Sequence, residues 1–112
     1  MFSPIAPLVA SLVLLAADRP PIYNVEPSCR GAVRQGIPGA DINICLRKEQ
    51  DARDQLVKQW TEFTAADKSY CVPLSSLGGR PTYTELLTCL DIARAVRTLR
   101  AEQGDALKRG KR

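Results

Sequence analysis

Four cysteines are the residues whose spacing says most about the chemistry of this 112-residue chain. Cys29, Cys45, Cys71 and Cys89 are separated by 16, 26 and 18 positions. Structural zinc sites usually bring their ligands in pairs about two to four residues apart, and no such pair is present. An even number of cysteines in a short chain from an oxidising compartment is typical of disulfides. We therefore expect two disulfides and no metal site.

Catalytic groups are hard to find because the sequence contains no histidine. This removes His-based triads, His general bases and His metal ligands. Ser75 and Ser76 lack an imidazole to activate them, and no motif points to a lysine base. Asp51 and Asp54 lie near Glu49 among basic residues, which is typical of a solvated helix face. We accordingly expect no catalytic residue, no cofactor and no enzymatic activity.

A stretch rich in serine and glycine, residues 72–80, is a candidate for binding. Its Gly78-Gly79-Arg80 segment could bind an anion, but it lacks the strand-then-helix context of a phosphate-binding loop. Proline, serine and glycine favour turns, so we expect a loop. The candidate binding loop consists of Ser75, Ser76, Gly78, Gly79 and Arg80.

The net charge of +4 is concentrated at the C-terminus. Lysine and arginine number 16 against 12 acidic residues, and four of those positive charges belong to Lys108, Arg109, Lys111 and Arg112. Without them the charges balance at 12 against 12. We expect residues 102–112 to form a flexible basic tail that makes weak contacts with anionic surfaces. We expect no nucleic-acid-binding face on the folded part.

The clearest helical pattern runs over residues 42–63. Asp41 is a suitable N-cap, and apolar residues recur at steps of three, four and seven. This stripe consists of Ile42, Cys45, Ala52, Leu56, Trp60 and Phe63. We expect Trp60 in the core, and Glu49 paired with Arg53 on the outer surface.

A second helix is predicted over residues 82–100. Thr82-x-x-Glu85 has the form of a capping box, and Gly104 is expected to stop any extension. Its apolar stripe consists of Leu86, Cys89, Leu90, Ala93, Val96 and Leu99. Arg94 and Arg97 lie off this stripe and are expected on the surface.

Two facing stripes, with no alternation typical of amphipathic strands, predict an all-α fold. We expect a small disulfide-stapled helical bundle or hairpin with two main helices, at about 42–63 and 82–100, and ordered loops. Between them, Thr64 is a suitable cap for one or two further turns before Cys71.

Helix length limits the cysteine pairing. If residues 45–63 are helical, Cys45 lies roughly 27 Å from the helix end, and only residues 64–70 lead back to Cys71. Because the Cα atoms of a disulfide lie within about 7 Å of each other, Cys45–Cys71 is nearly excluded. We favour Cys29–Cys45 with Cys71–Cys89, and leave Cys29–Cys71 with Cys45–Cys89 open.

The first 17 residues read as a signal peptide. Their uncharged apolar run is too short to span a bilayer of roughly 30 Å and ends in Ala16-Ala17. We expect cleavage after Ala16 or Ala17 and a periplasmic or secreted protein, with a retained anchor as the alternative. We then expect a proline-containing linker over 18–28, a domain over 29–101 that begins with a loop at 30–40, and the tail.

Several of these features follow one another as in a known family. Gln59-Trp60, Cys71, Gly78-Gly79, Cys89 and residues 94–99 resemble the LprI-like family, small exported bacterial helical domains with four cysteines that are named after a lysozyme inhibitor. The resemblance covers about residues 29–99. The chain between the second and third cysteines is shorter than usual for that family, and the Arg-Asp expected before the third cysteine is only Asp67.

Together these features predict an exported, non-catalytic module that binds an envelope protein or cell-wall component, in the manner of an inhibitor. The alternative is a protein that associates with anionic lipid or polymer through its basic C-terminal tail. Deleting residues 108–112 distinguishes the two. Many lysozymes are cationic, so an inhibitor gains from an acidic surface, which this charge-balanced domain does not offer.

Overall fold

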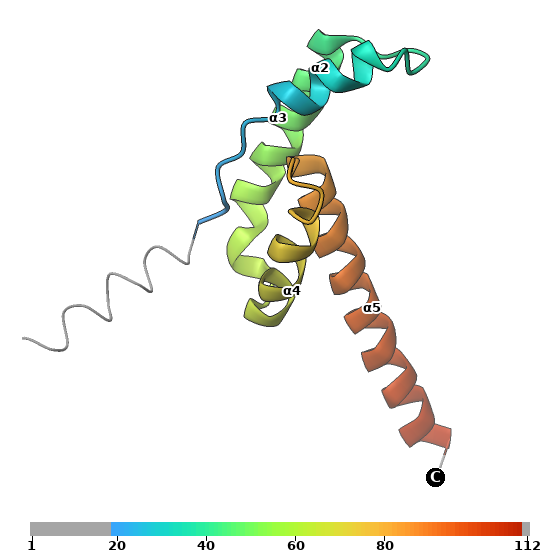
Figure 1. The fold of residues 1–112 in the computed structure, drawn as a ribbon. Coiled ribbons are helices and arrows are strands. Elements are labelled where there is room, and N and C mark those ends of the chain that lie inside the picture. Colours follow the sequence, from blue (N-terminus) through green and yellow to red (C-terminus); the bar gives the residue numbers. More distant parts are fainter. Residues whose placement is uncertain (1–18, 111–112) are drawn as a thin grey trace, which may run out of the picture.

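The computed structural model describes residues 19–110, and over this range the chain is all-α without a strand (Figure 1). The elements are α2 (Glu26–Arg34), α3 (Ile42–Gln59), a 3₁₀ turn (Trp60–Glu62), α4 (Ala65–Ser75) and α5 (Tyr83–Gly110). The fold thus has four helices over the described range, instead of two main ones. No helix between residues 19 and 110 is long and apolar enough to cross a membrane. The expected signal peptide, residues 1–17, lies outside the described residues.

The predicted helix over 42–63 is present but divides near its end. Asp41 caps α3 as expected, because its Oδ1 accepts hydrogen bonds from the Asn43 and Ile44 amides at 2.8 and 3.1 Å. After Gln59 the chain tightens into the 3₁₀ turn. Thr64 then caps α4 by accepting a bond from the Asp67 amide at 3.2 Å. This new start turns the chain so that α4 can pack on α5.

Helix α4 is longer than expected, so the loop predicted from residue 72 begins only after Ser75. Pro73 lies inside the helix, where it lacks the amide hydrogen that would bond the Ser69 carbonyl. The helix ends two residues later, and Ser69 is exposed, so water can satisfy the carbonyl. Pro73 therefore lies in the last turn of α4 and does not prevent that turn from forming.

Helix α5 also exceeds its prediction, because Gly104 does not stop it. A glycine that ends a helix usually adopts a positive φ, and Gly104 is not among the glycines that do so. Ala101, Glu102 and Gln103 before it, and Ala106 after it, favour helix. Residues 102–110, expected in a separate tail, therefore continue α5.

The core lies where α3, α4 and α5 meet. The buried residues are Ala52, Leu56, Trp60, Phe63, Cys71, Tyr83, Leu86, Leu87 and Leu90. Trp60 and Phe63 are buried as predicted. Val96 and Leu99 were expected to join them but are 40% and 56% exposed. Val96 faces an open groove between α4 and α5, and Leu99 lines a depression between α3 and α5.

The N-terminal part differs most from the prediction. Glu26 and Pro27 suit a first helical turn, and α2 begins there, so a helix replaces the end of the predicted linker and much of the predicted loop at 30–40. Residues 19–25 precede it without regular structure. Tyr23 packs against Tyr83 with ring centroids 5.0 Å apart, and its amide donates to the Tyr83 hydroxyl at 2.7 Å. The folded domain therefore begins before residue 29.

Each disulfide joins two consecutive helices. Cys29–Cys45 ties α2 to α3, and Cys71–Cys89 ties α4 to α5, with Cα–Cα distances of 5.6 and 5.7 Å. This is the pairing favoured from the sequence, and Cys29–Cys71 with Cys45–Cys89, which had been left open, is not formed. Neither bridge crosses from the α2–α3 half to the α4–α5 half, so the halves are held together by core packing and polar contacts.

Candidate functional site

The connection between α4 and α5 contains most of the candidate binding loop, and hydrogen bonds within the turn order its backbone. The Leu77 amide donates to the Leu74 carbonyl at 3.3 Å, and the Gly79 amide to the Ser76 carbonyl at 3.0 Å. Gly79 has a φ of 76°, which glycine adopts without the steric cost other residues meet. The loop is thus a defined turn.

The two serines of this candidate serve the helix end. Ser75 is the last residue of α4, so it lies outside the loop. The Ser75 and Ser76 hydroxyls both donate to the Val72 carbonyl, at 3.1 and 2.9 Å. Their polar groups are therefore engaged at the C-terminus of α4, and the loop proper is shorter than predicted.

Leu77 is the residue of this loop that sequence reasoning missed. Its side chain is 79% exposed although it is large and apolar. The neighbouring Gly78 adds no side chain, and a Cβ built there would meet nothing within 4 Å. An apolar residue between a serine pair and a glycine pair was the available signal. Leu77 consequently stands out from the surface.

Arg80 ends the loop next to α2, which the sequence could not indicate. A Cβ built on Gly31 of α2 would lie 3.6 Å from Nη1 of Arg80. The guanidinium therefore lies beside α2 while the residue stays exposed. The surface around the loop combines Leu77 and Arg80 with part of α2.

Both ends of the loop are fixed to the bundle. The Cys71–Cys89 bridge holds α4 against α5 just before the loop. On the far side, Thr82 Oγ1 accepts a hydrogen bond from the Glu85 amide at 3.1 Å, so the Thr82 cap is present. These anchors leave the loop little freedom to move as a whole.

Glu49 supplies the third anchor, and the prediction of a surface pair with Arg53 was wrong. Its side chain is buried and points from α3 to the start of α5. Its Oε2 accepts bonds from the Tyr83 and Thr84 amides at 2.7 and 3.4 Å, and its Oε1 accepts one from the Thr84 hydroxyl. A carboxylate suits the first turn of a helix, where amides lack partners and the dipole is positive. Glu49 is therefore buried because its carboxylate caps the N-terminus of α5.

The arginines of α5 hold α4 and its preceding turn in place. Arg94 lies over the Phe63 ring with Cζ 4.8 Å from the centroid. Its Nη2 donates to Gln59 Oε1 at 2.8 Å and to Asp91 Oδ1 at 3.1 Å. Gln59 and Arg94, two residues on which the family resemblance rests, thus meet in a structural contact.

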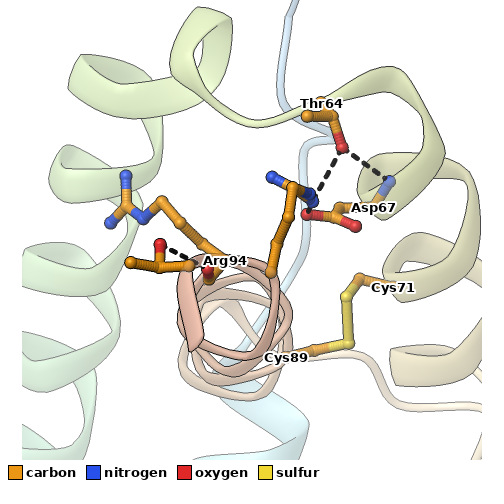
Figure 2. A network of polar contacts seen from close by, with 7 residues as sticks. Thr64, Asp67, Cys71, Cys89 and Arg94 are labelled. Atoms are coloured by element: carbon orange, nitrogen blue, oxygen red, sulfur yellow. Dashed lines mark hydrogen bonds and ion pairs between the residues drawn. A yellow bond between two sulfur atoms is a disulfide. The ribbon is translucent and has the colours of Figure 1, made fainter. Parts of the chain in front are cut away.

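A second arginine secures the start of α4. Arg97 forms an ion pair with Asp67 and donates to Thr64 Oγ1 at 3.0 Å. Figure 2 shows Thr64 and Asp67 facing α5, which also carries Arg94 and Cys89. Both arginines are partly exposed, as expected for surface residues, but they act as clamps between elements.

A groove of about 890 Å³ runs between α4 and α5. Tyr70 and Leu74 of α4 and Ile92 and Val96 of α5 form its apolar part, and each is between 40% and 64% exposed. Glu85 and Arg100 lie toward its opposite ends. The groove was not predicted from the sequence, because the apolar periodicity assigned Val96 to the core.

The basic end lies far from the loop. Lys108 and Arg109 are exposed in the last turn of α5, and Lys111 and Arg112 lie outside the described residues. At 1.5 Å per residue, the 28 residues of α5 place its ends roughly 40 Å apart. The α4–α5 loop and the basic end of α5 therefore cannot form one continuous binding surface in a single chain.

The described residues hold no cluster of three or more metal-ligating side chains, and the buried carboxylate of Glu49 is engaged with helix amides. No protein-family model, curated protein or solved structure matches this chain.

Proposed function

We propose that this protein is an exported, non-catalytic binding module that presents the α4–α5 loop to a partner in the cell envelope. The observation that carries the proposal is Leu77, a large apolar side chain exposed on a loop whose backbone and ends are fixed. An ordered loop loses little conformational entropy when a partner docks. The two disulfides suit an oxidising compartment.

The chemistry of the loop indicates the kind of partner. Leu77 can enter an apolar depression, and Arg80 of the same loop can meet an acidic group at the edge. A protein cleft with these features is the target we infer. This is inhibitor-like behaviour, in agreement with what the LprI-like resemblance implies.

Capture from the native envelope fraction tests the proposal. Immobilised protein should retain a partner that Leu77→Asp and Arg80→Glu both release, with the helical circular dichroism unchanged. Ile22→Asp is the matched control, because Ile22 is 89% exposed and precedes α2. Full capture by Leu77→Asp would refute the loop as the binding surface. Purified lysozyme, assayed on cell walls with and without the protein, is the first defined partner to try.

A second candidate function rests on the exposed end of α5. Leu107, Lys108 and Arg109 are all exposed there, and an apolar residue beside basic ones can lie on an anionic surface. Deleting residues 108–112 should abolish sedimentation with phosphatidylglycerol vesicles if the basic end acts in this way. Capture of a protein partner through the loop should survive the same deletion.

A further inference from the structure

We infer that the α4–α5 groove is the interface of a symmetric dimer, in which the α5 helices of two copies of this chain lie antiparallel. The inference is independent of the loop proposed above. It starts from four large apolar side chains that line this groove and are exposed in the single chain. They are Tyr70 and Leu74 on α4 and Ile92 and Val96 on α5.

The charges on the α5 side of the groove indicate a second copy as the occupant. Glu85, Ile92, Val96 and Arg100 follow one another at steps of seven, four and four, so they share one helix face. Neither the Glu85 carboxylate nor the Arg100 guanidinium has an ion-pair partner among residues 19–110. The face is acidic at one end, apolar in the middle and basic at the other end.

Such a face is complementary to itself when reversed. Glu85 lies seven residues before Ile92 and Arg100 eight residues after it, so the two charges lie at nearly equal distances, about 10–12 Å, on either side of Ile92. A two-fold axis close to Ile92 places Glu85 of each copy opposite Arg100 of the other. In a symmetric interface every contact occurs twice, so two ion pairs enclose the apolar centre.

The neighbouring helix completes the interface. Helix α4 lines the same groove, and the Cys71–Cys89 bridge ties it to α5. An α5 helix from the second copy would therefore contact α5 through Ile92 and Val96 and α4 through Tyr70 and Leu74. The result is a four-helix arrangement in which two α4–α5 pairs face each other.

Sedimentation velocity of the purified exported protein between about 1 and 500 μM tests this, because a dimer must dissociate on dilution. The wild-type protein should reach twice the monomer mass. Ile92→Asp should remain monomeric, whereas the exposed control Ile22→Asp should dimerise normally. A wild-type protein that stays monomeric over this range would overturn the inference.

Charge reversal tests the antiparallel register. Glu85→Arg and Arg100→Glu should each raise the dissociation constant at least tenfold, because each places like charges opposite one another twice. The double variant restores opposite charges and should return to within about threefold of wild type. Glu85→Arg also disturbs the first turn of α5, but a change at residue 100 cannot repair that effect, so rescue reports the contact between copies. A dimer indifferent to both single reversals would overturn the register.

Discussion

Glu49 shows how a single side chain can connect parts of a fold that no covalent bridge joins. It belongs to α3 and accepts hydrogen bonds from two amides of α5. It therefore links the α2–α3 half to the α4–α5 half. A buried carboxylate is costly unless it is hydrogen-bonded. The start of α5 satisfies that requirement with two amides and a hydroxyl.

Truncating this residue should therefore destabilise the protein. Glu49→Ala leaves the first amides of α5 without a partner, and we expect a loss of about 2–3 kcal/mol in the free energy of unfolding. Urea denaturation followed by circular dichroism measures it. Glu102→Ala, which removes an exposed carboxylate from α5, should change stability by less than about 0.5 kcal/mol. Equal effects of the two substitutions would contradict the capping role of Glu49.

Tyr23 and Tyr83 provide a matched pair of hydroxyl deletions. The Tyr83 hydroxyl accepts a hydrogen bond from the Tyr23 amide at 2.7 Å. Tyr83→Phe removes this bond and should lower the free energy of unfolding by about 1 kcal/mol. The buried Tyr23 hydroxyl has no hydrogen-bond partner among the described residues, so Tyr23→Phe should leave stability unchanged or raise it slightly. Thermal unfolding of the two variants side by side checks the order, and a reversed order would count against this assignment.

At the scale of elements, the caps were predictable and the helix ends were not. Asp41, Thr64 and Thr82 act as expected because a cap depends on residues within one turn. The stop at Gly104 was wrong because glycine is tolerated in a helix when good helix formers surround it. The position of Glu49 was missed because its partners lie more than thirty residues away along the chain, and no local pattern reports them.

In the candidate site, too, local features were predictable from the sequence and features that depend on helix packing were not. Loop formation near Gly78 and Gly79 was predictable from turn preferences. The exposure of Leu77, the approach of Arg80 to α2 and the groove beside Val96 depend on how helices pack. Periodicity identifies an apolar face but not how much of that face a neighbouring helix covers, and Leu99 beside α3 remains 56% exposed.

Gly104 offers a direct test of α5. It is helical, and an added Cβ would meet nothing within 4 Å, so Gly104→Ala should strengthen the helix locally by about 1 kcal/mol. Hydrogen exchange should slow at the amides around residue 104. Protection that stays unchanged or falls would indicate that the chain is not helical at this position.

The two disulfides should differ in what they stabilise. Cys71 belongs to the core cluster, whereas Cys29 in α2 is buried but lies outside that cluster. Replacing Cys29 and Cys45 by alanine should release α2 and reduce helicity by about its nine residues, while α3–α5 still unfold cooperatively. Replacing Cys71 and Cys89 should lower the stability of the whole bundle by about 3 kcal/mol. Loss of all tertiary structure in the first variant would contradict this division.

At the scale of the whole molecule, the segment before α2 is part of the folded unit. Tyr23 and Val25 pack against the core from a stretch that was expected to be a linker. The expected cleavage after Ala16 or Ala17 leaves this stretch in place. The proposed cleavage would therefore leave the folded unit intact.

Shortening the N-terminus tests that boundary. A chain that begins at Asn24 lacks Tyr23 and should lose about 2 kcal/mol of stability, because an aromatic ring and a hydrogen bond are removed from Tyr83. A chain that begins at Pro21 keeps both contacts and should match one that begins at Asp18. Differential scanning calorimetry of the three forms provides the comparison. Identical unfolding temperatures would show that the segment adds nothing to the fold.

The order of the cysteines has a consequence for how the molecule is made. A chain that enters an oxidising compartment N-terminus first exposes Cys29 and Cys45 well before Cys71, and each disulfide joins consecutive cysteines. The first bond can therefore close before a wrong partner is present, and the second pair is then the only one left. Oxidation during translocation should give the native pairing without a disulfide isomerase. Oxidation of the complete reduced and unfolded chain should give all three possible pairings at first, and peptide mapping would distinguish the two routes.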